Sequence, residues 1–354
     1  MSNELNSVEQ SRRNYLKEQK PRVYEKVMQF SDKVARGESI AIIQFQYDYT
    51  CNLRCQHCSV KRFQGKKEGR TFTLDDVRDF CRQADELGLA NFVITGGEPL
   101  VFPDFDKLVE AIDPSRFYIV SDSNGWLLDD EKARHLKSIG VDKIQLSLDS
   151  LDAQEHDEFR RRAGSHERAM RAIDACQKAG LNIILSTVVT HQRIHSEEFI
   201  EYLEFAKSKG VGTFVTYAKP VGSWEGKFDM LVTKEDMAYM RDVLEKKYDV
   251  FTHLTPSYGL DLGCIAMKRM ISVTKYGDVM PCPYIHVSIG NVFEEPLKDI
   301  IERGMNIKWF GKHVNTCLIA ESRPFIDKYI VPTYSKELPV PMCEVFSECD
   351  MIKK

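Results

Sequence analysis

Residues 40–58 read IAIIQFQYDYTCNLRCQHC, an apolar stretch typical of a buried strand that runs directly into three cysteines. Cys51, Cys55 and Cys58 therefore lie on a short loop just after a strand predicted at 40–47. Three thiolates held close together can bind an iron–sulfur cubane and leave one iron open. The spacing alone leaves two alternatives: a zinc site with His57 as a further ligand, or a cluster used only for electron transfer.

A strand pattern and a helix pattern alternate from residue 40 onward. Predicted strands cover 40–47, 91–95, 117–120, 143–148, 183–189 and 213–217. Predicted helices begin after Thr73 and cover 105–112, 129–138, 167–178 and 197–207. Such alternation favours a parallel sheet with right-handed crossovers. Six units are too few for a full eight-fold barrel, so we expect an α/β fold with a partial, open (β/α)6 TIM-like barrel.

The segments on either side of this core lack the alternation. Residues 1–39 are predicted as a helical lead-in, since Val23, Val27, Phe30 and Val34 follow helical spacing. The core is predicted to span 40–218. A linker with a helix at 234–245 is predicted over 219–259, and a small cysteine-bearing α+β domain over 260–354.

Composition excludes several classes of partner. The net charge of −4 provides no basic excess for a nucleic acid. No run of eighteen apolar residues occurs and the N-terminus is polar, so we expect no membrane partner and a cytoplasmic location. In a reducing compartment, clustered cysteines are more often metal ligands than disulfides. Cys81 and Cys176 stand apart on apolar helix faces and are expected to be buried hydrophobes.

The CxxxCxxC triad resembles the signature of the radical S-adenosylmethionine (SAM) superfamily. Gly96-Gly97-Glu98-Pro99, directly after the second predicted strand, matches the GGEP segment of that family. The resemblance implies a SAM-cleaving [4Fe–4S] cluster on the three cysteines and SAM as cofactor. Two glycines let the backbone approach a ligand closely, and carbonyls or Glu98 can accept from its ammonium group.

Polar residues also follow the later strands. Ser123 and Asn124 lie where the family places a polar segment near the SAM ribose. Ser147 and Asp149 end the fourth strand, and Thr190 ends the fifth. Because the carboxyl ends of parallel strands meet at one mouth, we expect all these residues to surround one SAM site.

An arginine is expected in the same site. The stretch 156–160 resembles the family segment that supplies it, so Arg160 could pair with the SAM carboxylate in a bidentate fork. Arg161 and Arg162 compete for that role, and a solvated charge run is the alternative interpretation.

The C-terminal cysteines indicate a second cluster. Cys264, Gly277 and Cys282 are spaced as at the opening of SPASM and twitch domains, in which a hairpin and a helix hold an auxiliary [4Fe–4S] cluster. A full SPASM pattern needs more cysteines than the five found from position 264 onward, so a SPASM/twitch-like domain with one auxiliary cluster is expected. The preferred ligands are Cys264, Cys282, Cys317 and either Cys343 or Cys349; an open iron that binds substrate, or a zinc site, remains an alternative.

The resemblance implies reductive cleavage of SAM to a 5′-deoxyadenosyl radical that removes a hydrogen atom from a substrate C–H bond. Related enzymes modify ribosomally made peptides, or oxidise or epimerise sugars and cyclitols. We favour peptide modification, with a sugar- or cyclitol-like small molecule as the alternative substrate and flavodoxin or ferredoxin as electron donor. A non-catalytic iron–sulfur electron-transfer or SAM-binding protein is the alternative from another class.

Substrate contacts are harder to predict. Tyr217, Lys219 and Trp224 follow the sixth strand and are candidates, with packing at the rim as the alternative. The basic loop 61–70 could meet an acidic substrate, although such runs are often only solvated. The lead-in is too short for a winged-helix peptide-recognition module.

Overall fold

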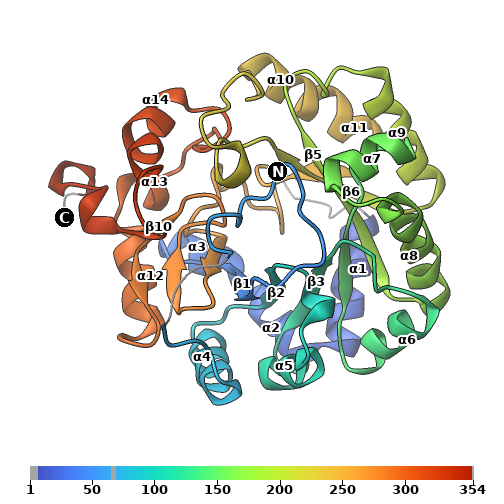
Figure 1. The fold of residues 1–354 in the computed structure, drawn as a ribbon. Coiled ribbons are helices and arrows are strands. Elements are labelled where there is room, and N and C mark those ends of the chain that lie inside the picture. The colour runs from blue at the N-terminus through green and yellow to red at the C-terminus, as the bar shows by residue number, and fades with distance from the viewer. Residues whose placement is uncertain (1–6, 65–68, 353–354) are drawn as a thin grey trace.

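Strand β1 (Ile42–Asp48) lies inside a ten-stranded sheet in the computed structural model, which describes residues 7–64 and 69–352. Six strands pair in chain order and in parallel, each followed by helical structure packed outside (Figure 1). The further strands of this series are β2 (Asn91–Gly96), β3 (Tyr118–Ser123), β4 (Lys143–Ser147), β5 (Asn182–Val189) and β6 (Gly212–Tyr217). The predicted α/β architecture with a parallel, barrel-like core is confirmed.

The outer helices form where the apolar periodicity predicts them. They are α4 (Leu74–Glu86), α5 (Phe105–Ile112), α6 (Asp130–Ser138), α8 (Ser165–Ala179) and α9 (Glu197–Ser208). Thr73 caps α4 in a capping box with Asp76. The helix predicted at 234–245 is instead α10 (Lys234–Tyr239), a π-helical turn (Met240–Leu244) and α11 (Glu245–Lys247).

Alternation along β1 explains how the sheet positions a site. Ile43 and Phe45 are fully buried in the main core, where Phe45 packs against Phe80 of α4. Gln44 and Gln46 point the other way and line a pocket. Successive side chains of a strand face opposite sides of a sheet, so the apolar face receives the helices and the polar face surrounds the pocket.

Two further parallel strands extend the barrel beyond the six predicted. Strand β7 (Val250–Thr252) pairs with β6, inside the range predicted as a linker. Strand β8 (Met270–Val273) comes from the C-terminal region and pairs with the free edge of β1. The guanidinium of Arg269, just before β8, donates to the carbonyl oxygens of His253 and Thr255, just after β7. The division of the chain into domains stays a prediction.

Antiparallel strands β9 (Asp278–Met280) and β11 (Gly290–Asn291) continue the sheet beyond β8. The β8–β9 turn uses Gly277 at φ 85°. Strands β10 (Val287–Ser288) and β12 (Val340–Pro341) form a separate pair. Helices α12 (Leu297–Met305), α13 (Lys308–Gly311) and α14 (Arg323–Phe325), with short 3₁₀ and π-helical turns, complete this region.

The lead-in forms three helices, α1 (Ser7–Gln19), α2 (Pro21–Met28) and α3 (Phe30–Ala35). Val23, Val27 and Phe30 are buried as the helical spacing predicts, in a cluster with Ile40 of the chain entering β1. Residues 1–6 of the predicted lead-in and 65–68 of the basic loop lie outside the described residues. Within the described part of the chain, every helix is too short or too polar to cross a membrane.

Candidate SAM and iron–sulfur site

One pocket gathers most of the predicted site residues. Its lining includes the three cysteines of the loop after β1 and residues from the carboxyl ends of the following strands. These are Cys51, Cys55, Cys58, Gly96, Gly97, Glu98, Ser123, Asn124, Ser147, Asp149 and Arg160. Pro99 and Thr190 are outside this lining. Convergence at the carboxyl ends of parallel strands follows from the barrel topology.

The three thiols fit an iron–sulfur cluster. They are free, they share one pocket, and two of them have polar partners: the backbone N–H of Leu53 lies 3.4 Å from Cys51 Sγ, and Arg160 Nη1 lies 3.7 Å from Cys55 Sγ. Donors and a positive charge beside sulfur stabilise cluster thiolates. Burial raises the pKa of Cys51 to about 12 and that of Cys58 to about 11, and a bound metal would replace the proton.

His57 is packed among aromatic rings. Its ring stacks on Phe159 at 4.6 Å between centroids and lies 5.8 Å from Trp224. Burial lowers the pKa of His57 to about 4. Over residues 7–64 and 69–352, His, Cys, Asp and Glu side chains form no group of three arranged around a single metal ion. Cubane thiolates bind separate iron atoms, so their sulfurs are spread more widely than around one zinc ion.

The GGEP segment lies directly against the backbone that leads to the cysteines. The N–H of Gly97 donates to the carbonyl oxygen of Asp48 at 2.9 Å, and that of Glu98 to Thr50 at 2.9 Å. A Cβ atom on Gly97 would overlap the carbonyl oxygen of Thr50. Glycine is therefore required for the close approach.

Replacing Gly97 with alanine is expected to separate the GGEP segment from the cysteine loop, because a backbone carbonyl cannot move aside cheaply. We expect SAM affinity to fall by at least about tenfold and the free energy of unfolding by about 1–3 kcal/mol. Equilibrium dialysis with labelled SAM and urea unfolding measure the two effects. Gly69→Ala is the control, because its added Cβ would meet Tyr276 at an ordinary 3.4 Å; equal losses in both variants would contradict the prediction.

Glu98 joins this segment to the polar turn after β3. One carboxylate oxygen accepts from the backbone N–H of Asn124 at 2.7 Å. The other accepts from the Ser123 hydroxyl at 2.9 Å and the Leu100 N–H at 3.2 Å. Burial raises the pKa of Glu98 to about 7. The structure thus uses this carboxylate to hold two predicted SAM-binding segments together.

Arg160 ends α7 (Ala153–Arg160), a helix that was not predicted from the sequence. Its Nε and Nη2 both lie 2.6 Å from Oδ2 of buried Asp149, while Nη1 faces Cys55. The interpretation of Arg160 as part of a solvated charge run is wrong. Arg162 is likewise engaged, since Nη1 donates to the carbonyl oxygen of Asn52 at 2.7 Å.

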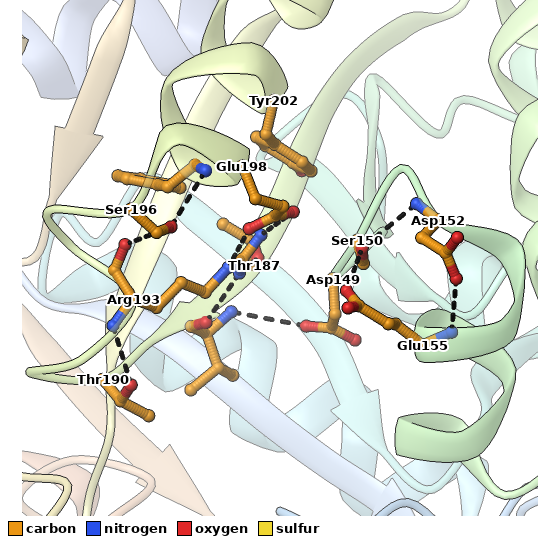
Figure 2. Close-up of polar contacts among 12 residues, drawn as sticks. Asp149, Ser150, Asp152, Glu155, Thr187, Thr190, Arg193, Ser196, Glu198 and Tyr202 are labelled. Carbon is orange, nitrogen blue, oxygen red and sulfur yellow. Dashed lines mark hydrogen bonds and ion pairs between the residues drawn. The ribbon is translucent and has the colours of Figure 1, made fainter.

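Figure 2 shows how Asp149 is linked to the end of β5. Its Oδ1 accepts from the backbone N–H of Val188 at 3.4 Å. Arg193 donates to the Val188 carbonyl at 2.9 Å and to the Thr187 hydroxyl at 2.5 Å, and pairs with Glu198 at 3.0 Å. The Thr190 hydroxyl accepts from the Arg193 N–H at 3.2 Å. In this structure Thr190 helps to hold the loop after β5.

Three of the C-terminal cysteines come together. Cys264, Cys282 and Cys317 are buried and close enough to affect one another's ionisation. Burial raises the pKa of Cys282 to about 12 and that of Cys317 to about 11. Cys343 and Cys349 are exposed, and Cys349 Sγ lies 3.0 Å from the Ser347 hydroxyl. Cys81 and Cys176 are buried in the core, as predicted.

Lys219 lies between the pocket and these three thiols. Tyr217, Lys219 and Trp224 all line the pocket. Lys219 is buried; its Nζ donates to the carbonyl oxygen of Tyr217 at 2.7 Å and lies 4.2 Å from the centroid of the Tyr284 ring. Burial lowers the pKa of Lys219, and the three cysteines oppose that shift.

Several residues of the pocket lining were not predicted from the sequence. Asp122 of β3, His253 after β7 and Tyr284 after Cys282 face the same pocket. Asp122 had a detectable signal, because a carboxylate inside a parallel strand is unusual and the two-residue period places it on the face opposite Ile119 and Ser121. His253 gave no such signal because strand β7 before it is only three residues long, and Tyr284 gave none because it lies in an irregular segment after Cys282.

Comparison with known proteins gives consistent matches. The model of the radical SAM superfamily matches residues 48–206, and that of the SPASM iron–sulfur cluster-binding domain matches 264–321. An AdoMet-dependent heme synthase of Methanosarcina barkeri is 26% identical over 296 residues, covering 76% of this chain and 84% of that protein. The mycofactocin maturase MftC of Mycolicibacterium smegmatis is 28% identical over 270 residues, covering 72% and 67%.

Solved structures share the fold. Streptococcus suis SuiB bound to its precursor peptide SuiA matches with a TM-score of 0.60 at 18% identity, covering 78% of this chain and 69% of that chain. At this identity the match concerns the arrangement of strands and helices alone.

Proposed function

Because this chain is a radical SAM enzyme with a C-terminal SPASM iron–sulfur domain, we propose that it removes a hydrogen atom from a C–H bond of a peptide substrate. The observation that supports the chemistry most strongly is the convergence of the three thiols with the GGEP segment in one pocket. An electron-transfer protein would need the cysteines but not the adjoining polar segments.

In this proposal Cys51, Cys55 and Cys58 hold the [4Fe–4S] cluster. Cluster and SAM, when bound, supply the 5′-deoxyadenosyl radical that takes the hydrogen atom. The backbone of 96–99 would receive the SAM ammonium group, and Ser123 and Asn124 the ribose.

The remaining predicted contacts also have roles in the proposal. Ser147 and Asp149 would complete the rim of the SAM site, and Thr190, which lies outside the lining, would act on it only by holding the loop after β5. Arg160, which Asp149 orients, would direct its remaining N–H groups to the SAM carboxylate. Its positive charge also lies beside Cys55, where it would stabilise a thiolate ligand.

The auxiliary cluster is assigned to Cys264, Cys282 and Cys317, which share a buried position. Either Cys343 or Cys349 stays a predicted fourth ligand, although their exposure in the structure favours a cluster held by three cysteines. Lys219 would offset part of the negative charge of these thiolates.

Changing Cys264, Cys282 and Cys317 together to alanine is expected to lower bound iron from about eight to about four atoms per chain, because one of two cubanes is lost. Iron analysis after anaerobic reconstitution measures this. The double change Cys343→Ala and Cys349→Ala is the control and should leave iron near eight. A fall of about four irons in the control as well would identify one of the exposed cysteines as an essential ligand.

Two comparisons favour a peptide substrate. One relative is the mycofactocin maturase MftC, and the fold is shared with SuiB, which was solved with its precursor peptide SuiA. The pocket is lined by residues of the barrel and by Pro283 and Tyr284 of the C-terminal region, so both parts of the chain would contact the substrate. A reduced flavodoxin or ferredoxin would supply the electron.

The test combines two incubations of the reduced, cluster-loaded enzyme with SAM. One contains synthetic peptides encoded by small reading frames next to the gene; the other contains perdeuterated sugars and cyclitols. A peptide that changes mass in proportion to 5′-deoxyadenosine formed would support the proposal. Deuterium in the 5′-deoxyadenosine of the second mixture, with no peptide changed in mass in the first, would replace it with the small-molecule alternative.

A further inference from the structure

Asp122 places a carboxylate in the pocket that the SAM site does not explain. It belongs to β3, lines the pocket, and is followed by Ser123 and Asn124, whose hydroxyl and N–H bind Glu98. The Thr95 hydroxyl is a hydrogen-bond partner of the Asp122 carboxylate. Its Oδ1 is buried and has no hydrogen-bond partner.

No cation of the described residues offsets the charge of Asp122. Burial raises its pKa to about 7, and its only opposing influence is the Thr95 hydroxyl. Lys219 also faces the pocket, but its charge is directed to the Tyr284 ring and the three C-terminal thiols. Arg160 is occupied by Asp149 and Cys55, and Arg54, which also lines the pocket, does not lower the pKa of Asp122. A buried carboxylate that has one oxygen without a donor and no cation beside it is costly unless a ligand supplies them.

The neighbouring side chains make a polar chamber around this carboxylate. Gln44, Gln145, Ser186 and Thr216 line the same pocket from β1, β4, β5 and β6. These are neutral groups that can orient a polar ligand without neutralising Asp122. In the ionised form of Asp122, a ligand with a neutral donor would satisfy the hydrogen bond yet leave the buried charge, whereas a protonated amine would satisfy both and would favour that ionised form.

We propose that Asp122 anchors the substrate through a protonated amine, such as the side chain of a lysine or a free amino group. Rotation about the terminal torsion of Asp122 would turn its unpaired oxygen toward that group, a motion that is soft for aspartate. This role of Asp122 adds to the proposed function a class of substrate, one with a cationic nitrogen. Its relevance to turnover rests on the proposed function.

The test measures binding and so does not depend on turnover. Calorimetry of the cluster-loaded enzyme, saturated with SAM under anaerobic conditions, compares n-butylammonium with its neutral analogue n-butanol. We expect the wild type to prefer the cation by at least about tenfold, as for hydrogen bonds to charged groups. Asp122→Asn should abolish that preference, and Gln145→Ala, which removes a neutral lining group, should retain it.

Two outcomes would overturn the proposal: no preference for the cation in the wild type, or a preference that persists in Asp122→Asn. Asp122→Ser, which is smaller and neutral, replaces the first variant if circular dichroism shows that Asp122→Asn does not fold. Formation of 5′-deoxyadenosine by the wild type is assayed in parallel. Absence of product, together with failure of the cluster-loaded wild type to bind SAM, would reject the radical chemistry, and an intact cation preference would still leave the amine site standing.

Discussion

Changing Cys51, Cys55 and Cys58 together to alanine is expected to abolish 5′-deoxyadenosine formation, with a loss of at least about a thousandfold. The three thiols converge in the pocket with the GGEP segment, and no other described cysteines share that lining. The assay is chromatography of 5′-deoxyadenosine after reduction of the reconstituted protein with SAM. The iron content should fall by about four atoms at the same time.

The control for this variant is Cys81→Ala, which removes a buried thiol of α4 far from any predicted ligand role. It should keep both its iron and its product. Substantial 5′-deoxyadenosine from the triple variant would contradict the assignment of the cluster. Absence of product from a wild type with a reducible cluster calls for a SAM-binding measurement, since some enzymes of this chemistry cleave SAM only with substrate bound.

The second large effect concerns Asp149. Its replacement by alanine leaves the guanidinium of Arg160 buried without a carboxylate, and removes an acceptor for the N–H of Val188. Loss of one partner of a buried ion pair costs about 3–5 kcal/mol. We expect that loss in the free energy of unfolding, measured by urea titration of cluster-free protein so that loss of iron does not contribute.

Asp130→Asn provides the comparison, because Asp130 pairs with Lys178 at the exposed surface. Exposed pairs contribute at most about 1 kcal/mol. If both variants lost the same stability, the Asp149–Arg160 pair would not have the role that its burial indicates.

The sequence predicted the six-unit core because β1 to β6 are long enough to show their apolar pattern and are separated by periodic helices. Strands β7 and β8 escaped prediction for different reasons. Val250–Thr252 is only three residues long. Met270–Val273 lies among the cysteines of the C-terminal region. Its four apolar residues do not indicate that it pairs with β1, which lies more than two hundred residues earlier in the chain.

The parts of the candidate site that belong to continuous sequence motifs were predicted. The cysteine triad and GGEP stand in contiguous stretches, so their meeting follows from strand order. The bond between Arg160 and Asp149 depends on α7, whose sequence AQEHDEFR has too few apolar residues to show a periodic face. The difference in exposure between Cys317 and Cys343 likewise arises only from tertiary packing.

The pairing of β8 with β1 has a consequence for biogenesis. During synthesis on the ribosome, the edge of β1 that pairs with β8 stays unpaired until residues 270–273 have been made. Such an edge is a template for association with other chains. Truncation before residue 270 should therefore yield an aggregating product, and the C-terminal region has to be made before the SAM pocket can mature.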